Sequence, residues 1–461
     1  MKRTLVIVFL GIWSSFSYAQ RNYAQELVDF LQQGRCFEAK ELYMNHADKL
    51  PQNDTALHLL YKSHIALFFN KPDSAEIYLE ELLGNTNYQM TLGPITDLYY
   101  MKLLTLYVVN QQFDLAMKLC DKMLDYCKIN PFNYVNDSIQ SIMNSLKNAK
   151  TTLKEREIYE PRIKIYRNSE RMNESIQLYE DNRIRFDAYY NGIPIETLFD
   201  TGLDFHLAIV KSLADEIGVK VSRENQNTQR VINGIPTKAY QGIIDSIELG
   251  NIKLYNIPVL VFKETITPPL PDTLNDIMRK EIERVFKDRQ IAIGVPTMRL
   301  IGKFEFDWNK NTLSFPEDGI SKIGNTTSNI CFIDNELYMR LKFNGLNYSG
   351  RLDTGSDNFL TITPSYYEMN KSSIEIYAEI SQPYDLYTVL STSLNIPYKL
   401  VKRSGVFFRG REIKHEREPV LVIEKPAISN KLDGFIGVLL FKSILPKVLL
   451  DFENMEIELK D

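Results

Sequence analysis

The stretch Leu198-Phe199-Asp200-Thr201-Gly202 decides the fold, because the chain carries a second copy of its centre in Arg351-Leu352-Asp353-Thr354-Gly355. A lone Asp-Thr-Gly triplet occurs by chance at about one position in a few thousand. Here the match continues without gaps when Asp200 is aligned with Asp353. The further matches are Asn191-Gly192 with Asn344-Gly345, Asp204 with Asp357, Leu207 with Leu360, Ile209 with Ile362 and Ser212 with Ser365. Ungapped agreement of this length indicates an internal duplication.

Each aspartate follows a predicted β-hairpin. Apolar and polar residues alternate before both Asn-Gly turns, at Ile184, Phe186 and Ala188 and again at Met339, Leu341 and Phe343. Alternation with period two followed by Asn-Gly is typical of a tight hairpin whose second strand runs up to the aspartate. A short helix is predicted after each triplet, at 212–217 and from Pro364, since proline suits a first helical position.

Each copy ends with an apolar-apolar-Gly element and a closing strand pair. The elements are Ile291-Ala292-Ile293-Gly294 and Gly434-Phe435-Ile436-Gly437. The strand pairs are 304–307 with 313–315, and 448–451 with 457–459. The two copies of the pattern therefore divide this part of the chain into two β-rich segments, 175–320 and 328–461.

These paired motifs resemble those of the aspartic peptidases, in a pepsin-like arrangement of two retropepsin-type lobes. The resemblance implies two β-barrel-like lobes with a cleft between them, and Asp200 and Asp353 as the catalytic pair. It also implies that Thr201 and Thr354 lock the two loops together, and that the apolar-Gly elements pack beneath them. Two adjacent carboxyls share one proton, because like charges repel in a desolvated site. The ionised carboxyl then activates a water while the protonated one polarises the scissile carbonyl, with no cofactor or metal.

Further residues receive roles around this pair. Gly202 and Gly355 let the backbone approach the carboxylates and donate to them. Ser356 is expected to hydrogen-bond its aspartate through its hydroxyl. A flap over the substrate is expected at 228–240, with Asn233 and Gly234 at its tip and Tyr240 either over the substrate or packed in the strand.

Three departures from the family pattern affect the activity. Leu203 follows the first triplet, where a small or hydroxyl residue is usual, and Arg351 stands where a buried apolar residue is usual. The matching flap segment in the second copy, 387–409, keeps no similar pattern. The apolar setting of Asp200 favours it as the aspartate with the raised pKa. An insert, Pro268–Pro271 with a charged helix at 272–289, is placed at the border of the cleft.

Residues 20–155 have helical periodicity instead. The segments Gly34–Ala39, Asn70–Ala75 and Gln111–Ala116 each join a turn to a helix that begins near a small residue. They resemble tetratricopeptide-type repeats, in which stacked helix pairs bury a continuous core. The region is either a peptide- or protein-binding scaffold or a packing domain without a ligand. The fold class is thus multidomain, an α-helical repeat domain followed by two duplicated all-β acid-protease lobes.

The first residues predict export. Lys2 and Arg3 precede the short apolar run 5–13, and Ser17-Tyr18-Ala19 is a small-x-small cleavage pattern. This is typical of a secretory signal peptide at 1–19, which would place the protein in the periplasm or outside the cell. The alternative is a single anchoring helix, although the run is short for a bilayer. No later stretch predicts a membrane span.

Composition excludes other classes. A net charge of −5 without a basic stripe gives no reason to expect a nucleic-acid partner. The four cysteines match no zinc spacing and form either a disulfide or buried free thiols. The histidines at 46, 58 and 64 stand at no metal-ligand spacing.

The sequence therefore predicts an exported aspartic endopeptidase that binds a peptide or protein substrate between its lobes. The alternative is a catalytically weak or inactive protease-like module that binds peptides or proteins, with the helical domain recruiting a partner. A third reading is a structural module of the cell envelope. No Gly-rich phosphate loop, Gly-x-Ser-x-Gly or Cys-x-x-Cys supports kinase, serine hydrolase or redox chemistry.

Overall fold

The computed structural model describes most of the chain. The described residues are 22–50, 54–129, 136–171, 174–221, 228–232, 235–262, 276, 279–280, 291–317, 328–333, 335–388, 391–402, 405–414, 419–423 and 433–460. The chain divides into two compact units, one ending at Thr55 and the other spanning Ala56–Asp461. The signal-peptide segment 1–19 lies outside the described residues, as does almost all of the insert 268–289.

The first unit is a helical hairpin. Helix α2 (Tyr23–Gln32) is capped by Asn22, whose side chain accepts from the Gln25 backbone N–H at 3.1 Å. The turn to α3 (Cys36–His46) contains Gly34 at φ +71°, and the Arg35 N–H donates to the Phe30 carbonyl at 2.8 Å. This left-handed turn satisfies carbonyls that the helix end would otherwise leave unpaired.

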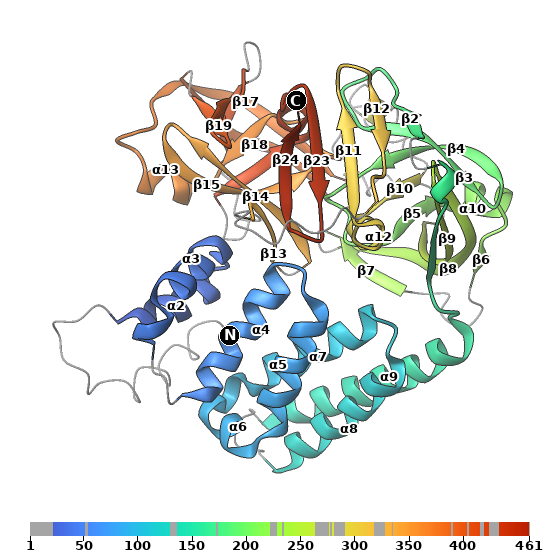
Figure 1. The fold of residues 1–461 in the computed structure, drawn as a ribbon, viewed down its shortest axis with the longest axis vertical. Coiled ribbons are helices and arrows are strands. Elements are labelled where there is room, and N and C mark those ends of the chain that lie inside the picture. Colours follow the sequence, from blue (N-terminus) through green and yellow to red (C-terminus); the bar gives the residue numbers. More distant parts are fainter. Residues whose placement is uncertain are drawn as a thin grey trace. The chain divides into compact units, whose positions relative to one another are not determined.

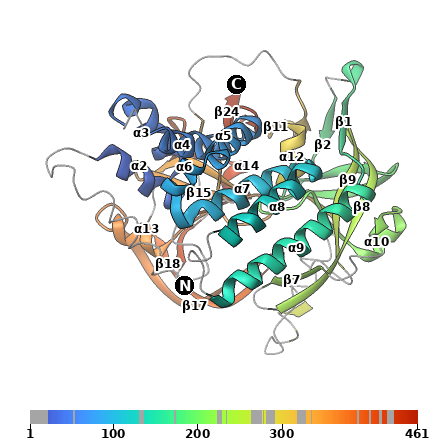
Figure 2. The same ribbon diagram turned by 90° about the horizontal axis from the view of Figure 1, so that it is seen from below.

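The second unit begins with further helices that repeat this turn. They are α4 (Thr55–Phe68), α5 (Pro72–Gly84), α6 (Thr86–Leu92), α7 (Thr96–Val109), α8 (Phe113–Ile129) and α9 (Asn136–Tyr159). Asn70 and Gln111 have φ of +51° and +54°, and the next residue donates to the carbonyl five positions back at 2.8 Å in each case. Ala75 and Ala116 are fully buried near the start of α5 and α8. The predicted helical region is confirmed, and Figure 2 shows α7, α8 and α9 stacked side by side.

The first lobe is a closed barrel. Its strands are β1 (Lys164–Arg167), β3 (Arg185–Tyr190), β4 (Ile193–Phe199), β5 (Leu207–Val210), β6 (Lys220–Val221), β7 (Thr228–Ile232), β8 (Ile235–Leu249), β9 (Ile252–Phe262) and β10 (Ile291–Ile293), with helix α10 (Lys211–Glu216) after β5. The order β9-β5-β10-β4-β3-β8 closes on itself because β8 also pairs with β9. Asn191 and Gly192 have φ of +49° and +86° in the turn between β3 and β4, so the predicted hairpin is confirmed.

The second lobe has the corresponding local pairings. Its elements are β13 (Ile330–Ile333), β14 (Glu336–Phe343), β15 (Leu346–Asp353), β16 (Leu360–Ile362), α13 (Pro364–Met369), β17 (Ile376–Thr388), β18 (Ser391–Val401), β19 (Val406–Phe408), β20 (Arg411–Glu412), β21 (Val420–Ile423), β22 (Gly434–Gly437) and α14 (Val438–Lys442). Strand β22 runs parallel to β15 and antiparallel to β16, just as β10 runs parallel to β4 and antiparallel to β5.

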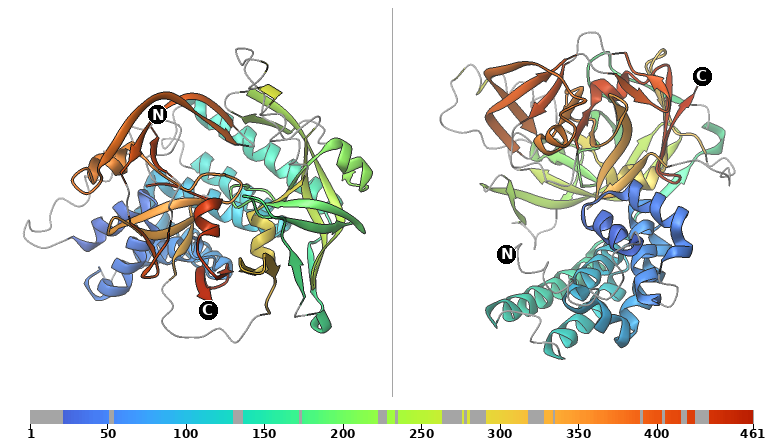
Figure 3. Two further views of the ribbon diagram at one scale, coloured as in Figure 1. Left: turned by 90° about the horizontal axis from the view of Figure 1, so that it is seen from above. Right: turned by 90° about the vertical axis from the view of Figure 1, so that its left-hand side faces the viewer.

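The second lobe also has a long hairpin that sequence reading missed. Strands β17 and β18 pair antiparallel over 376–401 and are visible as a long curved pair in Figure 3. They follow the short helix of their lobe, as β7 and β8 do in the first lobe. The segment 387–409, in which no flap pattern was recognised, begins within β17 and contains β18. It has neither an Asn-Gly turn nor regular alternation, so this hairpin has no local sequence signature.

One sheet joins the two lobes. It has the order β2-β12-β11-β23-β24, built from β2 (Ser175–Gln177), β11 (Lys303–Asp307), β12 (Thr312–Ser314), β23 (Lys447–Asp451) and β24 (Glu456–Lys460). Strand β11 of the first lobe pairs antiparallel with β23 of the second, and Figure 1 shows this sheet between the lobes. The closing strand pairs were predicted, but their pairing with each other was not.

An aromatic cluster fills the space behind the first Asp-Thr-Gly loop. Phe199 contacts Phe304 and Phe306 edge to face at centroid distances of 5.1 and 5.4 Å. Phe306 also contacts Phe441 of α14 at 5.5 Å, so the cluster includes both lobes. Fully buried aromatic side chains contribute large apolar areas and hold the loop that follows Phe199 in one position.

The helices contact the β region of this unit at the turn before α5. The Asn70 side chain donates to the Phe452 carbonyl at 2.8 Å and accepts from Arg299 of α12 (Val295–Ile301) at 2.7 Å. Lys71 donates to the Glu453 carbonyl at 2.8 Å. Asn70 and Lys71 of this turn therefore attach the helices to the β region.

Two further expectations concern the cysteines and membrane-spanning helices. Cys120 and Cys127 are buried free thiols. Within the part of the chain that the structure describes, no helix combines the length and apolarity needed to cross a membrane.

We expect Ala75→Leu to destabilise the helical region by about 1–3 kcal/mol, because extra methylenes in a packed contact force neighbouring side chains apart. Ala75 has no exposed surface and packs with Ala66 and Leu106. Urea unfolding followed by circular dichroism measures the change. Ile77→Ala in the same helix is the control, since Ile77 is 61% exposed and its truncation should change stability by less than about 0.5 kcal/mol. Equal losses in both variants would contradict the close packing at Ala75.

Candidate active site

Reciprocal hydrogen bonds between two threonines join the two Asp-Thr-Gly loops. The Thr201 N–H donates to the Thr354 hydroxyl at 3.0 Å, and the Thr354 N–H donates to the Thr201 hydroxyl at 3.0 Å. Each hydroxyl then donates across the interface at 2.8 Å, Thr201 to the Leu352 carbonyl and Thr354 to the Phe199 carbonyl. Both threonines are buried, where backbone polar groups need a protein partner. Each loop supplies hydrogen-bond partners for backbone groups of the other loop.

The carboxyls lie against the opposite glycines. The Gly202 N–H donates to Asp200 Oδ1 at 2.8 Å, and the Gly355 N–H donates to Asp353 Oδ1 at 3.1 Å. A Cβ on Gly202 would lie 2.5 Å from Asp353 Oδ1, and a Cβ on Gly355 would lie 2.5 Å from Asp200 Oδ1. Only glycine leaves room for this approach, and the two carboxyls are thereby held over the same small area of backbone.

The apolar-Gly elements support both loops in the same way. Val295 N–H donates to the Leu203 carbonyl at 3.0 Å, and Val438 N–H donates to the Ser356 carbonyl at 2.9 Å. Glycine is required at the end of each element. A Cβ on Gly294 would lie 2.1 Å from the Phe205 carbonyl oxygen, and a Cβ on Gly437 would lie 1.9 Å from that of Asn358.

Leu203 points into the first lobe. Its side chain is 3% exposed and belongs to a cluster with Leu198, Ala208, Leu260 and Ala292. The side chain therefore fills the barrel interior beneath the loop.

Ser356 has a different role from the expected one. Its hydroxyl accepts from the Asn358 amide at 2.9 Å, and no hydrogen bond to the Asp353 carboxyl forms within the described residues. The expected support of this acid by the hydroxyl is therefore not observed, and the Ser356 hydroxyl instead binds Asn358, two residues further along the loop.

Two arginines link the lobes beside the loops. Arg183 of the first lobe binds Asp357 of the second through two parallel contacts of 3.0 Å, Nε to Oδ1 and Nη2 to Oδ2. Arg351 of the second lobe donates from Nη2 to the Gly202 carbonyl at 2.9 Å and pairs through Nη1 with Glu336 at 2.8 Å. Arg351 stands where an apolar residue is usual in the family pattern, and its side chain extends across the lobe interface to the first loop.

The predicted flap is in part observed. Strands β7 and β8 form an antiparallel hairpin in which Ile232 pairs with Ile235. Tyr240 is half-buried in β8 and pairs with Val261 of β9. Asn233 and Gly234, the predicted tip, lie outside the described residues.

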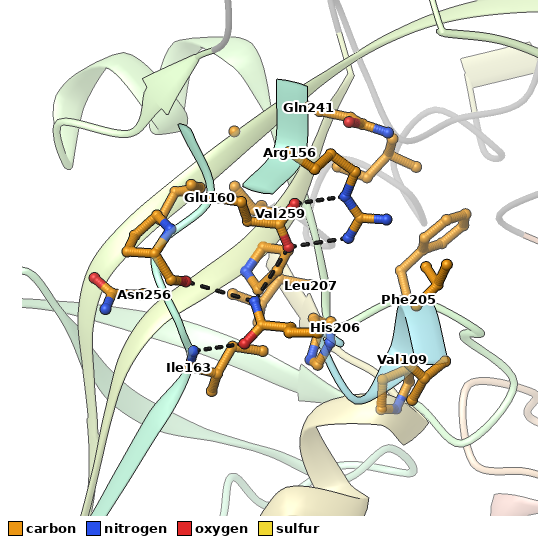
Figure 4. Close-up of a pocket in the computed structure, with 18 of the residues that line it drawn as sticks. Val109, Arg156, Glu160, Ile163, Phe205, His206, Leu207, Gln241, Asn256 and Val259 are labelled. Atoms are coloured by element: carbon orange, nitrogen blue, oxygen red, sulfur yellow. Dashed lines mark hydrogen bonds and ion pairs between the residues drawn. The ribbon is translucent and has the colours of Figure 1, made fainter. Parts of the chain in front are cut away.

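A cavity of about 1020 Å³ lies beside the first loop, between the helices and the barrel. The loop contributes Asp204–Leu207, strands β8 and β9 contribute Gln241 and Val259, and the ends of α7 and α9 contribute Val109 and Arg156 (Figure 4). Within its wall, Arg156 pairs with Glu160 through contacts of 2.6 and 2.9 Å. The helical region thus forms one wall of a space continuous with the residues that follow the triplet.

His206 is a titratable group in this wall. Its pKa is lowered to about 4, chiefly by burial; Glu160 nearby raises it, and Arg156 and Arg299 contribute to lowering it. Its Nδ1 lies 3.3 Å from the Thr297 hydroxyl. The imidazole is therefore neutral at neutral pH. Among the described residues, no cluster of histidine, cysteine, aspartate and glutamate is suited to hold a metal ion.

Comparison with known proteins supports an aspartic peptidase. The family model for aspartyl proteases matches residues 186–277, which contain the first triplet and the β7–β8 hairpin. A retropepsin-like aspartic protease from Rickettsia conorii is similar at 20% identity over 34% of this chain and 93% of that chain, with a TM-score of 0.20. No curated protein matches the chain. Because that TM-score is too low to carry an argument, the assignment depends on the family match and the site geometry.

Sequence reading missed three residues around the site, Arg183, Glu336 and His206. A signal for two of them was available. Arg183 and Glu336 each stand 17 residues before their aspartate (200 − 183 and 353 − 336) and thus at matching positions when Asp200 is aligned with Asp353. No spacing pattern in the sequence identifies His206, because its burial arises only in the folded chain.

We expect Thr354→Val to cost about 1–3 kcal/mol of stability, because it leaves the buried Thr201 N–H without an acceptor. Thr201→Val should cost a similar amount for the reciprocal reason. Chemical unfolding measures both. Thr312→Val in β12 is the matched control, since Thr312 is half-buried and its hydroxyl has no hydrogen bond within the described residues. A control loss as large as those of the two variants would contradict a special role for the pair.

His206 should make stability depend on pH. Its pKa of about 4 in the folded protein lies below its ordinary value of 6.5, so the unfolded chain takes up the proton first as the pH falls. Stability should therefore be full above pH 6.5 and decline between pH 6.5 and 4, by up to about 3 kcal/mol. In His206→Gln this decline should be smaller, as measured by unfolding at pH 7 and 4.5. An unchanged pH dependence in the variant would rule His206 out as its source.

Proposed function

We propose that the protein is an aspartic endopeptidase that hydrolyses peptide bonds with a water activated between Asp200 and Asp353. The observation that carries the proposal is the reciprocal placement of each carboxyl against the glycine of the opposite loop. This placement requires both copies of the triplet, and it brings together two acids that belong to different lobes.

The geometry explains how the pair would work. Two carboxyls over one small area of backbone cannot both ionise readily, so one proton is shared between them. The ionised carboxyl takes a proton from the bound water as the water attacks the scissile carbonyl carbon. The protonated carboxyl donates to the carbonyl oxygen, and proton transfer to the departing amine completes the cleavage. The amides of Gly202 and Gly355 hold the carboxyls in place during these transfers.

A catalytically inactive binding module is the second candidate. Leu203 was its main support, and the burial of that side chain in the barrel weakens this candidate.

The substrate proposed is a peptide or protein segment between the lobes, covered by the β7–β8 hairpin with Tyr240 at its base. The cavity beside residues 204–207 suggests a role for the helices. Its walls are partly apolar, through Val109, Phe205 and Val259, and one wall is helical. We propose that the helical repeats extend the binding surface for a protein partner or a long substrate. The signal-peptide pattern at 1–19 supports export as part of this proposal, to the periplasm or outside the cell.

We expect Asp200→Asn and Asp353→Asn each to reduce peptide cleavage by about 10²- to 10⁴-fold, the usual contribution of general acid–base catalysis. Cleavage of a peptide library from pH 3 to 8, read by mass spectrometry, measures the loss. Asp215→Asn is the control, because this carboxyl is exposed on α10 and pairs only with Lys211 of the same helix among the described residues. Unchanged cleavage in the double Asn variant would refute the proposal. Tight binding of a peptide without turnover by the unmodified protein would favour the binding module.

A helical wall for the substrate predicts a length effect. Val109→Trp should raise KM for substrates long enough to reach the cavity while leaving short peptides unaffected, because the larger side chain fills space lined by Val109 and Phe205. Val109 is 45% exposed, so the substitution should be tolerated. Exposed Ile158→Trp on α9, another lining residue, tests a second point of the same wall. If neither variant distinguishes long from short peptides, the helices do not contact the substrate.

A further inference from the structure

Arg351 brings a positive charge to the aspartate pair. It lies on β15, two residues before Asp353, and its side chain crosses to the carbonyl of Gly202 in the opposite loop. That same glycine donates to Asp200 and accommodates the carboxyl of Asp353. The guanidinium is therefore fixed at the backbone position that both carboxyls share.

The matching position of the duplication shows how this arrangement arises. Arg183 of the first lobe makes its ion pair with Asp357 of the second lobe. The residue that corresponds to Arg183 is Glu336, which has the opposite charge and pairs with Arg351 of its own lobe. One side of the interface is thus bridged by an arginine–carboxylate pair, and the other by an arginine that binds a main-chain carbonyl of the catalytic loop.

The charged and titratable groups around Arg351 come from both lobes. Burial works against its charge, but Asp353, Glu336, Tyr338 and, more weakly, Asp200 outweigh this effect and raise its pKa. Its Nε is buried without a hydrogen-bond partner among the described residues. The guanidinium is thus held by a hydrogen bond to the Gly202 carbonyl, by the ion pair with Glu336 and by surrounding negative charge.

We propose that Arg351 is a positioning residue that lowers the pH range in which the aspartate pair shares one proton, with Glu336 limiting the size of this effect. The inference rests on the proposed peptidase function. A fixed positive charge stabilises ionised carboxylates and so favours loss of both protons at lower pH. The bond to the Gly202 carbonyl sets the distance at which this charge acts.

The pH profile of kcat/KM tests the inference, since its two limbs report the pair in the free enzyme. Arg351→Met keeps much of the side-chain volume without the charge and should move both limbs to higher pH by about 0.5–1 unit. This is smaller than the shift of about 1–3 units for an uncompensated neighbouring charge, because Glu336 neutralises part of it. Arg351→Lys keeps the charge and should stay close to the unmodified profile.

Glu336→Gln provides the opposite arm. It removes the compensating negative charge, so both limbs should move to lower pH. Opposite shifts in Arg351→Met and Glu336→Gln, with little shift in Arg351→Lys, support the proposal. A parallel loss of activity at every pH without movement of the limbs would overturn it and leave Arg351 with a purely structural role. An Arg351→Lys profile displaced as far as that of Arg351→Met would also overturn it.

A readout without turnover separates this inference from the proposed function. The pH dependence of the unfolding temperature is measured for the unmodified protein and for Arg351→Met, each alone and with Asp200→Asn added. The difference caused by Asp200→Asn reports the titration of the pair, and it should move to higher pH in the Arg351→Met background. If the unmodified protein cleaves no peptide but this shift occurs, the peptidase proposal fails and the electrostatic role of Arg351 stands. If cleavage occurs without the shift, only the role of Arg351 fails.

Discussion

The two hydrogen bonds exchanged by Thr201 and Thr354 are the constraint on which the site depends. In each bond, a buried backbone N–H of one loop has its acceptor, a threonine hydroxyl, in the opposite loop. A buried donor without an acceptor costs more than an ordinary hydrogen bond contributes, so neither loop is satisfied alone. The approach of each carboxyl to the opposite glycine follows from this exchange, because the threonines bring the following residues into contact.

The rest of the second unit holds this contact closed. Behind it, the aromatic cluster of Phe199, Phe304, Phe306 and Phe441 packs residues of both lobes together. At its side, β11 and β23 continue one sheet across the two lobes. The helices are attached at the same region, since Asn70 and Lys71 bind the main chain just after β23. The chain at β23 and just after it therefore contacts both the helices and strand β11 of the other lobe.

The matching sequence motifs explain why much of this arrangement could be predicted from sequence. Asn191-Gly192, the two triplets and the apolar-Gly elements have local signatures that depend on backbone conformation, and the structure places strands and turns where these signatures stand. What sequence reading missed depends on contacts between distant segments. The pairing of β11 with β23, the orientation of Leu203 into the barrel and the preference of Ser356 for Asn358 leave no pattern in a single stretch. Arg351 was recognised as unusual, but its partners Glu336 and Gly202 become neighbours only in the fold.

The unequal residues at matching positions have a further consequence. A site built from two identical halves offers a peptide two equivalent orientations, related by the symmetry axis. Here Arg183 is matched by Glu336, Leu203 by Ser356 and His206 by Phe359, and the helices line a cavity beside the loop of the first lobe. A bound chain that runs from its amino to its carboxyl end therefore meets different chemistry from one that runs the other way. Such a site can read the direction of a polypeptide as well as the identity of its side chains.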